Sequence, residues 1–349
     1  MICGAGVIGA SVAYFLARRG VQVTVVERSA VACAASGKSG GFLALDWCDD
    51  SSLGPLARAS FALHAELART LPSDYGYRRV ETLMLRARED GTTPGGHRAT
   101  PPAWLDGAGV LIGALGSTET TAQLHPARFT TALLEASGAT LRMGRVEDLV
   151  EHEGRASGVR VDGTIVDADA VVLAMGPWTG RLPRRLRLPR VRGLKGYSVT
   201  LRGAAVPAQA LFVDYRTADG RHLEPEIVPR ADGDVYVCGM ADPAPLPDSP
   251  DDVAVDHAAC ETLARAAATV STALADARID RRQACYRPVT DDGLPLIGRV
   301  PGLPGAYVAT GHGPWGMLNA PATGLALAEL IADGASRSLD LDPFDPARR

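Results

Sequence analysis

Cys285 and Arg287 stand two residues apart in QACYRPVTDDGLPLIG, residues 283–298, immediately before a proline and an acidic turn. A guanidinium group can pair with a carboxylate through two parallel hydrogen bonds, which suits the binding of an acidic substrate group. A thiol beside that cation is predicted to have a lowered pKa and to react as a thiolate. Two plainer roles stay open: Cys285 as a buried core residue, and Arg287 as the ion-pair partner of Asp291 or Asp292.

Glycines near the N-terminus predict a dinucleotide-binding turn. GAGVIGAS places Gly4, Gly6 and Gly9 between a short strand and the helical pattern ASVAYFLARRG. Gly4 permits the tight turn, Gly6 lets the backbone approach a pyrophosphate, and Gly9 lets the helix pack closely on the strand. The free N–H groups at the start of the helix then face the phosphates.

Glu27 ends the second strand of this βαβ unit, VQVTVVE. A carboxylate there can accept hydrogen bonds from ribose hydroxyls and would repel a phosphate, which argues against NADP. The first strand has only Met1, Ile2 and Cys3 before the turn, whereas strands usually have about five residues. We therefore expect the natural chain to begin further upstream.

A second glycine-rich segment, GHGPWGMLNAPATG at residues 311–324, follows the strand pattern AYVAT. It would supply the second wall that FAD needs, because FAD reaches beyond the first βαβ unit. A helix that opens near Gly316 and Met317 would point its N-terminus at the flavin and stabilise the negative charge of the reduced ring. This wall favours FAD over the alternative of an NAD-dependent dehydrogenase.

Composition is typical of a globular enzyme. A chain of 349 residues, 46% of them hydrophobic, can form two domains with substantial cores. The net charge of −4, without a basic stripe, argues against a nucleic-acid partner. No apolar run reaches the roughly 18 residues of a membrane span, and six scattered cysteines without metal-ligand spacing indicate a reducing compartment. We expect a cytoplasmic or organelle-lumen protein, with room for a targeting segment missing from the chain.

Periodicity and turn residues predict the remaining elements. They comprise helices over 52–71 and after His125-Pro126, a surface loop over 91–107, short strands over 139–173 with a turn at GRASGV, a parallel strand that ends on Gly176, antiparallel strands over 191–240 with a hairpin turn at ADGD, an exposed connector over 241–252, and a long amphipathic helix over 251–277.

A set of motifs together resembles the FAD-dependent oxidoreductases of the D-amino-acid oxidase superfamily, which includes glycine oxidase and sarcosine oxidase. These motifs are GAGVIGAS, Glu27, ASGKSGG, VVLAMGPWT, RPVTDDGLPLIG and ATGHG with APATG. GKSGGFLALDWCDD and TAQLHP resemble a eukaryotic branch of that superfamily. The resemblance implies an α/β fold with a discontinuous Rossmann-like FAD-binding domain, residues 1–50, 120–190 and 286–349. A substrate domain on a mixed, largely antiparallel β-sheet would comprise residues 51–119 and 191–285.

The resemblance implies catalytic roles for Arg287 and Lys38. Arg287 matches an arginine that pairs with the substrate carboxylate in glycine oxidase-like members, and it would orient the α-carbon for hydride transfer to flavin N5. Lys38 would lie near the pyrophosphate or the flavin face and stabilise reduced flavin; a solvated loop lysine is the alternative. Pro314 and Trp315 stand where a second cation often helps to hold the carboxylate.

Cys285 aligns with the cysteine that sarcosine oxidase-like members attach to flavin. Non-covalent FAD is favoured, and covalent attachment through Cys285 is the alternative. No metal site is expected. The residues expected to bind the cofactor are Gly4, Gly6, Val7, Ile8, Gly9, Glu27, Arg28, Ser36, Gly37, Lys38, Ser39, Gly40, Gly41, Val146, Ala174, Gly176, Trp178, Cys285, Gly311, Gly313, Gly316 and Met317.

Aromatic and histidine residues supply further candidates. Trp47, Tyr215, Tyr286 and Trp315 are candidates for lining a substrate pocket, with simple packing as the alternative. His312 follows a strand end and is a candidate base, although hydride transfer from an amine needs no strong base. His125 with Pro126 is expected to start a helix.

The first hypothesis is therefore an FAD enzyme that oxidises a C–N bond of a small amino acid or secondary amine. The alternative is a flavin-bound regulatory or binding protein with little turnover, which the missing second cation favours. The electron acceptor, the substrate and the oligomeric state stay open.

Overall fold

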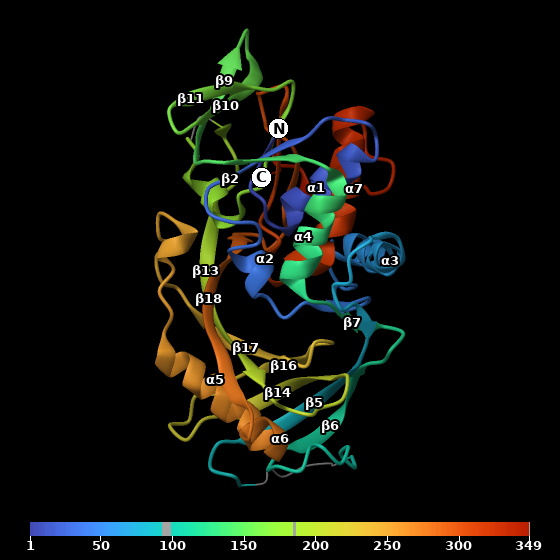
Figure 1. Ribbon diagram of the computed structural model, residues 1–349, viewed down its shortest axis with the longest axis vertical. Coiled ribbons are helices and arrows are strands. Elements are labelled where there is room, and N and C mark those ends of the chain that lie inside the picture. Colours follow the sequence, from blue (N-terminus) through green and yellow to red (C-terminus); the bar gives the residue numbers. More distant parts are fainter. Residues whose placement is uncertain (93–98, 184–185, 349) are drawn as a thin grey trace.

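The computed structural model describes residues 1–92, 99–183 and 186–348. Figure 1 shows a helix-covered half that contains both termini and, below it, a half built on a large curved sheet. This architecture confirms the α/β fold with mixed sheets. The predicted loop over 91–107 lies partly outside the described residues, and its described parts contain no helix or strand.

A six-stranded sheet forms the centre of the upper half, in the order β19-β20-β12-β1-β2-β8. The strands are parallel except for the pair β19 and β20. Their bounds are Leu296–Arg299 for β19, Ala306–Thr310 for β20, Val171–Leu173 for β12, Ile2–Cys3 for β1, Thr24–Glu27 for β2 and Thr140–Met143 for β8. The strand expected to end on Gly176 thus ends earlier, because a 3-10 helix, Gly176–Arg181, begins at that glycine.

Alternate residues of this sheet pack into two different cores. Ile2 and Val25 belong to a core shared with the helices, whereas Cys3 and Val26 belong to a core on the opposite face. Strands buried on both faces read as continuous apolar runs, as these do. Four helices cover the first face: α1 Val7–Ala17, α3 Gly54–Thr70, α4 Pro126–Ser137 and α7 Gly316–Ala332.

Pro321 interrupts the hydrogen bonding of α7, and α3 compensates for it. Proline has no N–H to donate to the carbonyl of Met317 one turn earlier. His64 Nε2 lies 3.0 Å from that oxygen, and the N–H of Ala322 donates to Ser60 Oγ at 2.9 Å. Ser60 and His64 are one turn apart on α3, so a single helix face satisfies both broken positions of α7.

A three-stranded antiparallel sheet covers the second face of the six-stranded sheet. Its strands are β9 Val146–His152, β10 Arg155–Val161 and β11 Thr164–Asp167. The turn expected at GRASGV is wrong in extent: only Glu153 and Gly154 turn, with positive φ, and RASGV forms strand. Hydrophobic residues at alternate positions, Val159 and Val161 among them, draw this segment onto the sheet.

The lower half is an eight-stranded mixed sheet in the order β18-β13-β17-β16-β14-β5-β6, with β15 beside β14. All its pairs are antiparallel except β14 with β5. The bounds are Arg278–Thr290 for β18, Val191–Arg202 for β13, Val235–Asp242 for β17, Glu226–Pro229 for β16, Gln209–Arg216 for β14, His222–Leu223 for β15, Glu81–Arg88 for β5 and Val110–Gly116 for β6. The hairpin turn between β16 and β17 falls at ADGD, as predicted.

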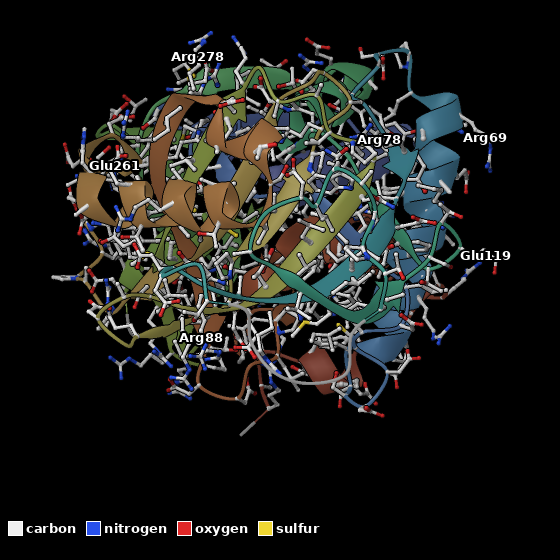
Figure 2. The ribbon with its side chains drawn as sticks, turned by 90° about the horizontal axis from the view of Figure 1, so that it is seen from below. Arg69, Arg78, Arg88, Glu119, Glu261 and Arg278 are labelled. Carbon is white, nitrogen blue, oxygen red and sulfur yellow. The ribbon has the colours of Figure 1, made fainter. Side chains whose placement is uncertain are left out.

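Two helices, α5 His257–Val270 and α6 Thr272–Ala275, pack on one face of this sheet. Figure 2 shows α5 lying across the strands, with charged side chains such as Glu261 and Arg278 projecting at the edge. The single long helix expected over 251–277 is wrong, because Ser271 is extended (φ −156°, ψ 133°) and separates the two. Asp106 accepts a hydrogen bond from Thr272 N–H at the start of α6, and the Gly107 N–H donates to the Val270 carbonyl at the end of α5. The adjoining loop therefore supplies hydrogen-bond partners for both helix ends.

The smaller elements join the halves. β3 Phe42–Ala44, β7 Thr121–Gln123 and β4 Arg78–Arg79 form a three-stranded antiparallel sheet. One helical turn, α2 Ala35–Lys38, lies within the glycine-rich loop after β2. The boundary expected between residues 285 and 286 falls inside β18, which pairs with β13 along its length. The division into two discontinuous domains stays a prediction.

Candidate functional site

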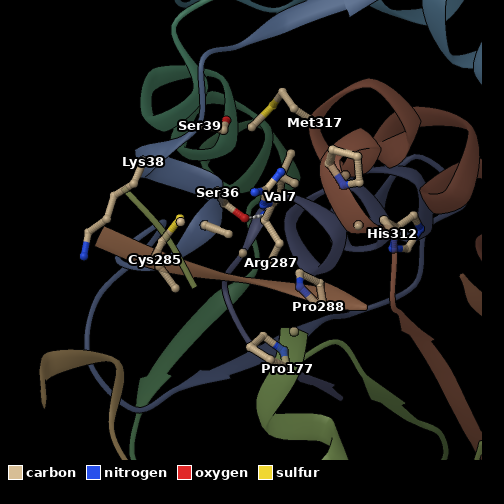
Figure 3. A pocket seen from close by; sticks show the side chains of 18 of the residues that line it. Val7, Ser36, Lys38, Ser39, Pro177, Cys285, Arg287, Pro288, His312 and Met317 are labelled. Atoms are coloured by element: carbon tan, nitrogen blue, oxygen red, sulfur yellow. Dashed lines mark hydrogen bonds between the residues drawn. The ribbon is translucent and has the colours of Figure 1, made fainter. Parts of the chain in front are cut away.

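A cavity of about 1000 Å³ lies between the six-stranded sheet and the free face of the eight-stranded sheet. This volume is at the upper end of the range of roughly 300 to 1,000 Å³ for small-molecule sites. Figure 3 shows Lys38 and Cys285 on one side of the cavity and His312 on the other, with Arg287 and Pro288 on β18 between them. Most of the residues expected to bind the cofactor line it: Gly4, Gly6, Val7, Ile8, Glu27, Arg28, Ser36, Lys38, Ser39, Gly40, Gly41, Val146, Ala174, Gly176, Trp178, Cys285, Gly313, Gly316 and Met317.

The first glycine turn leaves no room for side chains. Gly4 has φ +107°, and a Cβ there would lie 2.5 Å from the Ala174 carbonyl oxygen. A Cβ on Gly9 would overlap the carbonyl oxygen of Gly4, although Gly9 itself does not line the cavity. The N–H of Val7, at the start of α1, donates to Ser36 Oγ at 2.9 Å. The loop that follows β2 thus contacts the first turn of α1, and both Val7 and Ser36 line the cavity.

Glu27 is fixed by the backbone on both sides. Its carboxylate accepts from Ala5 N–H at 2.9 Å and from Ser29 N–H at 3.0 Å. These bonds tie the end of β2 to the glycine turn and place an acceptor at the cavity wall. That placement fits an acid that binds ribose hydroxyls.

The second glycine segment forms the opposite wall. Gly311 (φ +82°) and Gly313 (φ +57°) turn the chain from β20 into α7, which begins at Gly316. Gly313, Gly316 and Met317 line the cavity, but Gly311 does not: a Cβ there would lie 2.8 Å from Thr290 Cγ2, so its role is close packing. The N-termini of α1 and α7 therefore open on one cavity, an arrangement that favours a ligand with negative charge at both ends.

His312 lines the cavity but is a poor base. It is buried, its Nε2 lies 3.1 Å from Thr323 Oγ1, and its Nδ1 has no partner in the described part of the chain. Burial lowers the pKa of His312 to about 3, so the ring is neutral at physiological pH.

The loop of residues 36–41 is held by the eight-stranded sheet. Tyr236 Oη donates to the Lys38 carbonyl at 3.0 Å, and buried Arg230 donates to the Ser39 carbonyl at 2.9 Å. A Cβ on Gly40 would lie 3.2 Å from the Tyr236 ring, so this glycine allows the approach. Gly37 does not line the cavity, since a Cβ there would overlap the Ala32 carbonyl oxygen.

Lys38 is oriented rather than solvated at random. Its Nζ donates to the Ala284 carbonyl on β18 at 3.2 Å, which brings the ammonium group beside Cys285 at the cavity wall. This bond anchors the half-buried Lys38 to β18, and its catalytic role stays a prediction.

Arg287 has no ion-pair partner among the described residues, although it lines the cavity. The acids considered as its partners are bound elsewhere: Asp291 pairs with Arg192 at 3.4 Å and Asp292 with Arg348 at 2.7 Å. Neighbouring Gly196 on β13 leaves space for the guanidinium, since a Cβ there would lie 3.6 Å from Arg287 Nη2. The guanidinium fork is therefore available to a ligand carboxylate.

The lowered pKa expected for Cys285 is wrong. Burial is the largest influence and raises the pKa of the thiol, while Lys38 and Arg287 only offset part of that rise. Desolvation penalises the thiolate more than two cations at some distance favour it. Cys285 is therefore a thiol at neutral pH, which removes the main argument for its reactivity.

The aromatic candidates divide. Trp47 and Trp315 line the cavity, with ring centroids 6.4 Å apart. Tyr215 is fully buried in the core between the large sheet and α5, and Tyr286 donates to the Pro245 carbonyl at 2.7 Å outside the cavity lining. His125 caps α4 as expected, accepting from Arg128 N–H.

Sequence reasoning missed the residues that β14, β16 and β17 contribute. Phe212, Glu226 and Cys238 line the cavity and are neighbours across the sheet, in the register Phe212 to Glu226 and Glu226 to Cys238. Their positions follow from strand pairing, which no local sequence motif predicts. QALFVDYR and EIVP have no strict alternation of apolar and polar residues that would have indicated which side chains face a ligand.

The composition of the connector after β17 predicted an exposed segment, but the connector also forms specific contacts. Asp248 pairs with Arg181 at 2.6 Å and with Arg145 at 3.3 Å, and its carbonyl accepts from Arg28 at 2.5 Å. Trp178 Nε1 donates to the Pro247 carbonyl at 3.0 Å. The segment 246–251 therefore crosses from the large sheet to the residues around Glu27, and Asp248 and Pro250 line the cavity there.

Among residues 1–92, 99–183 and 186–348, no helix has the length and apolar character required to cross a bilayer.

Comparison with known proteins agrees with this geometry. Residues 1–330 match the family model of DAO, FAD dependent oxidoreductase. A relative in Schizosaccharomyces pombe, whose name says no more than oxidoreductase, is 32% identical over 381 residues, covering 99% of this chain and 97% of its own length. It confirms the resemblance to a eukaryotic branch.

Glycine oxidases are similar over the same span. That of Geobacillus kaustophilus is 28% identical over 375 residues, covering 99% of this chain and 96% of the relative. A crystal structure of glycine oxidase from that organism superposes with a TM-score of 0.84 at 27% identity, covering 100% of this chain and 98% of the other.

Proposed function

The chain belongs to the DAO family of FAD-dependent oxidoreductases, and we propose on that premise that it oxidises a C–N bond of a small amino acid or secondary amine. Similarity to glycine oxidase along the whole chain supports this substrate class. The observation that carries the proposal is the unpaired guanidinium of Arg287 within the cavity bounded by both glycine walls.

The residues of the cavity fit FAD. Gly4 and Gly6 at the start of α1 would approach the pyrophosphate, Glu27 would accept from the ribose hydroxyls, and Gly316 at the start of α7 would face the flavin. FAD, when bound, accepts the hydride that leaves the substrate carbon. Because burial keeps Cys285 protonated, we propose that the cofactor is held without a covalent bond.

Arg287 would bind the substrate carboxylate through both arms of its fork, which restricts the rotation of the α-carbon. Lys38, held by Ala284, would place a positive charge at the cavity wall. Trp47 and Trp315 would exclude water from the apolar part of the substrate.

Anaerobic mixing of the purified yellow protein with single amines and D- or L-amino acids tests this proposal. Bleaching of the flavin absorbance by at least one compound is expected. In the variant Arg287→Met, affinity for the same compound should fall on the order of 10- to 100-fold, because a charged hydrogen bond contributes about 1.5 to 3 kcal/mol. The surface variant Arg278→Met is the control, since Arg278 lies at the exposed edge in Figure 2.

A flavin-bound regulatory or binding protein is the second candidate. Pro314 and Trp315 at the cavity wall, in place of a further cation, favour it. Failure of every compound in the panel to bleach the flavin would support that function and contradict the enzymatic one.

A further inference from the structure

Glu226 lies at the centre of a row of side chains that crosses the large sheet. The row follows from the pairing of strands. Met84 on β5 is opposite Phe212 on β14, Phe212 is opposite Glu226 on β16, and Glu226 is opposite Cys238 on β17. The row continues from Cys238 to Ser198 on β13. All five line the cavity. Cross-strand partners share one face of a sheet, so the carboxylate faces the ligand space between an aromatic ring and a thiol.

No cation pairs with Glu226 among the described residues, and only the thiol of Cys238 adjoins it as a hydrogen-bonding neighbour. Glu224 also lines the cavity without a partner among the described residues, but it is exposed to solvent, and the remaining carboxylates, Glu147 among them, are paired. Asp214 pairs with Arg86 and His222, Asp248 with three arginines, and Glu27 with two backbone N–H groups. Glu226 is half-buried, and a partly desolvated carboxylate without a partner favours a cationic ligand group.

Arg287 is near enough to act on the charge of Glu226 but does not form an ion pair with it. The guanidinium lies over Gly196 on β13, whereas Glu226 stands two strands further into the sheet, on β16. Arg287 and Glu226 thus offer a cation and an anion that are separated from each other and face the same space. This arrangement complements a zwitterion, whose carboxylate and ammonium groups are joined to one carbon.

We propose that Glu226 binds the ammonium group of the substrate opposite Arg287 and accepts the proton that this nitrogen must lose before oxidation. The inference rests on the proposed amine oxidation. In the step, an N–H bond of the ammonium group breaks, its electron pair stays on nitrogen, and the proton forms an O–H bond with Glu226 Oε. The nitrogen lone pair then assists the departure of hydride from the neighbouring carbon.

Burial supports the role of Glu226 as the proton acceptor. It raises the pKa of Glu226, and Arg287 offsets part of that rise. A carboxylate with a raised pKa is a better proton acceptor than an exposed one. The other titratable groups that line this cavity are Cys33, Cys238, Cys285, Tyr197, Tyr236, His312, Lys38, Glu27, Glu147, Glu224, Asp214 and Asp248, together with Arg28, Arg145, Arg181 and Arg287.

The test compares the wild-type holoprotein with Glu226→Gln, which keeps the shape of the side chain and removes its charge. Binding of acetate and of methylamine is followed by the perturbation of the bound-flavin spectrum, a measurement that needs no turnover. Glu226→Gln should bind methylamine on the order of tenfold more weakly. It should bind acetate several-fold more tightly, because Arg287 then lacks its neighbouring anion. Glu81→Gln, on the exposed side of the same sheet, is the control.

Rapid-reaction kinetics test the proton transfer. The rate of anaerobic flavin reduction in the wild type should rise with pH through an acidic limb that Glu226→Gln lacks. Equal binding of methylamine and acetate by wild type and variant would overturn the amine site, and an unchanged acidic limb would overturn the proton transfer. If the wild type reduces its flavin with no amine, the proposed function fails instead, and the two binding measurements still decide the role of Glu226.

Discussion

Arg287 lies across Gly196, so that a Cβ at position 196 would be 3.6 Å from Nη2 and 3.7 Å from Nε of the guanidinium. The two residues are on paired strands, where Gly196 is opposite Cys285 and Leu194 is opposite Arg287. The absence of a side chain at position 196 on β13 therefore leaves room for the guanidinium. This relationship connects the identity of one glycine to the placement of the carboxylate-binding group.

Substitutions at Gly196 should displace Arg287 in order of size. A methyl group makes ordinary van der Waals contact at 3.6 Å, so Gly196→Ala should weaken acetate binding only slightly. Gly196→Leu should weaken it on the order of tenfold, because the fork can no longer make both hydrogen bonds. Titration by flavin absorbance measures both. Thr164→Leu, at an exposed position of β11 outside the cavity lining, is the control. Equal affinities across the series would contradict the placement.

Gly9→Ala should destabilise the protein by about 1 to 3 kcal/mol, as overpacking does. The new Cβ would overlap the Gly4 carbonyl oxygen, so α1 must move away from the turn. Urea unfolding monitored by circular dichroism measures the change, and the flavin content of the purified variant reports the damage to the site. Gly113→Ala should leave both at wild-type values.

Asp248→Asn should loosen the segment 246–251 and release FAD more readily. Its three arginine partners, Arg28, Arg145 and Arg181, would keep only weaker contacts. Each pair is solvent-exposed and contributes about 0.2 to 1 kcal/mol, so the loss of all three should raise the Kd for FAD on the order of 3- to 100-fold. The difference should shrink in high salt. Glu261→Gln, which breaks an exposed pair with Arg282 on the far side, should not change the Kd.

Acid should destabilise the fold through its buried histidines. Burial lowers the pKa of His64 to about 4, from the ordinary 6.5 that it has when unfolded. Stability from neutral His64 is therefore complete above about pH 6.5 and is lost as the pH falls towards 4, since only the unfolded chain takes up the proton. At pH 5 the loss is about 2 kcal/mol for this residue, and His312 should behave similarly.

Urea unfolding at pH 7 and pH 5 measures that loss. His64→Gln keeps a donor for the Met317 carbonyl but binds no proton, so its stability should depend less on pH than that of the wild type. Exposed His152→Gln should show the wild-type dependence. Identical pH dependence in all three proteins would refute the assignment.

Cys285→Ser should retain its yellow colour and its flavin content. If FAD is held without a covalent bond, acid precipitation should release all flavin from wild type and variant alike, and the intact mass of the wild type should equal that of the polypeptide. A mass increase equal to FAD in the wild type alone would show the tether through Cys285.

The sequence predicted the parts of the site that are local in the chain. The glycine turn before α1, Glu27 at the end of β2 and the helix start after His125 each occupy a few consecutive residues, and their geometry depends on the φ angles and capping groups of those residues. The second glycine wall was visible for the same reason. These features sufficed to indicate two helix N-termini and a dinucleotide.

Tertiary structure alone decided what faces the ligand from the large sheet and how it is charged. Glu226, Phe212 and Cys238 are distant in sequence, and only the pairing of β14, β16 and β17 puts them in one row. Burial, which raises the pKa of Cys285 and lowers that of His312, likewise depends on neighbours contributed by remote segments. Local motifs determine backbone shape because sterics act between adjacent residues. Proximity and desolvation arise only when separate strands pack together.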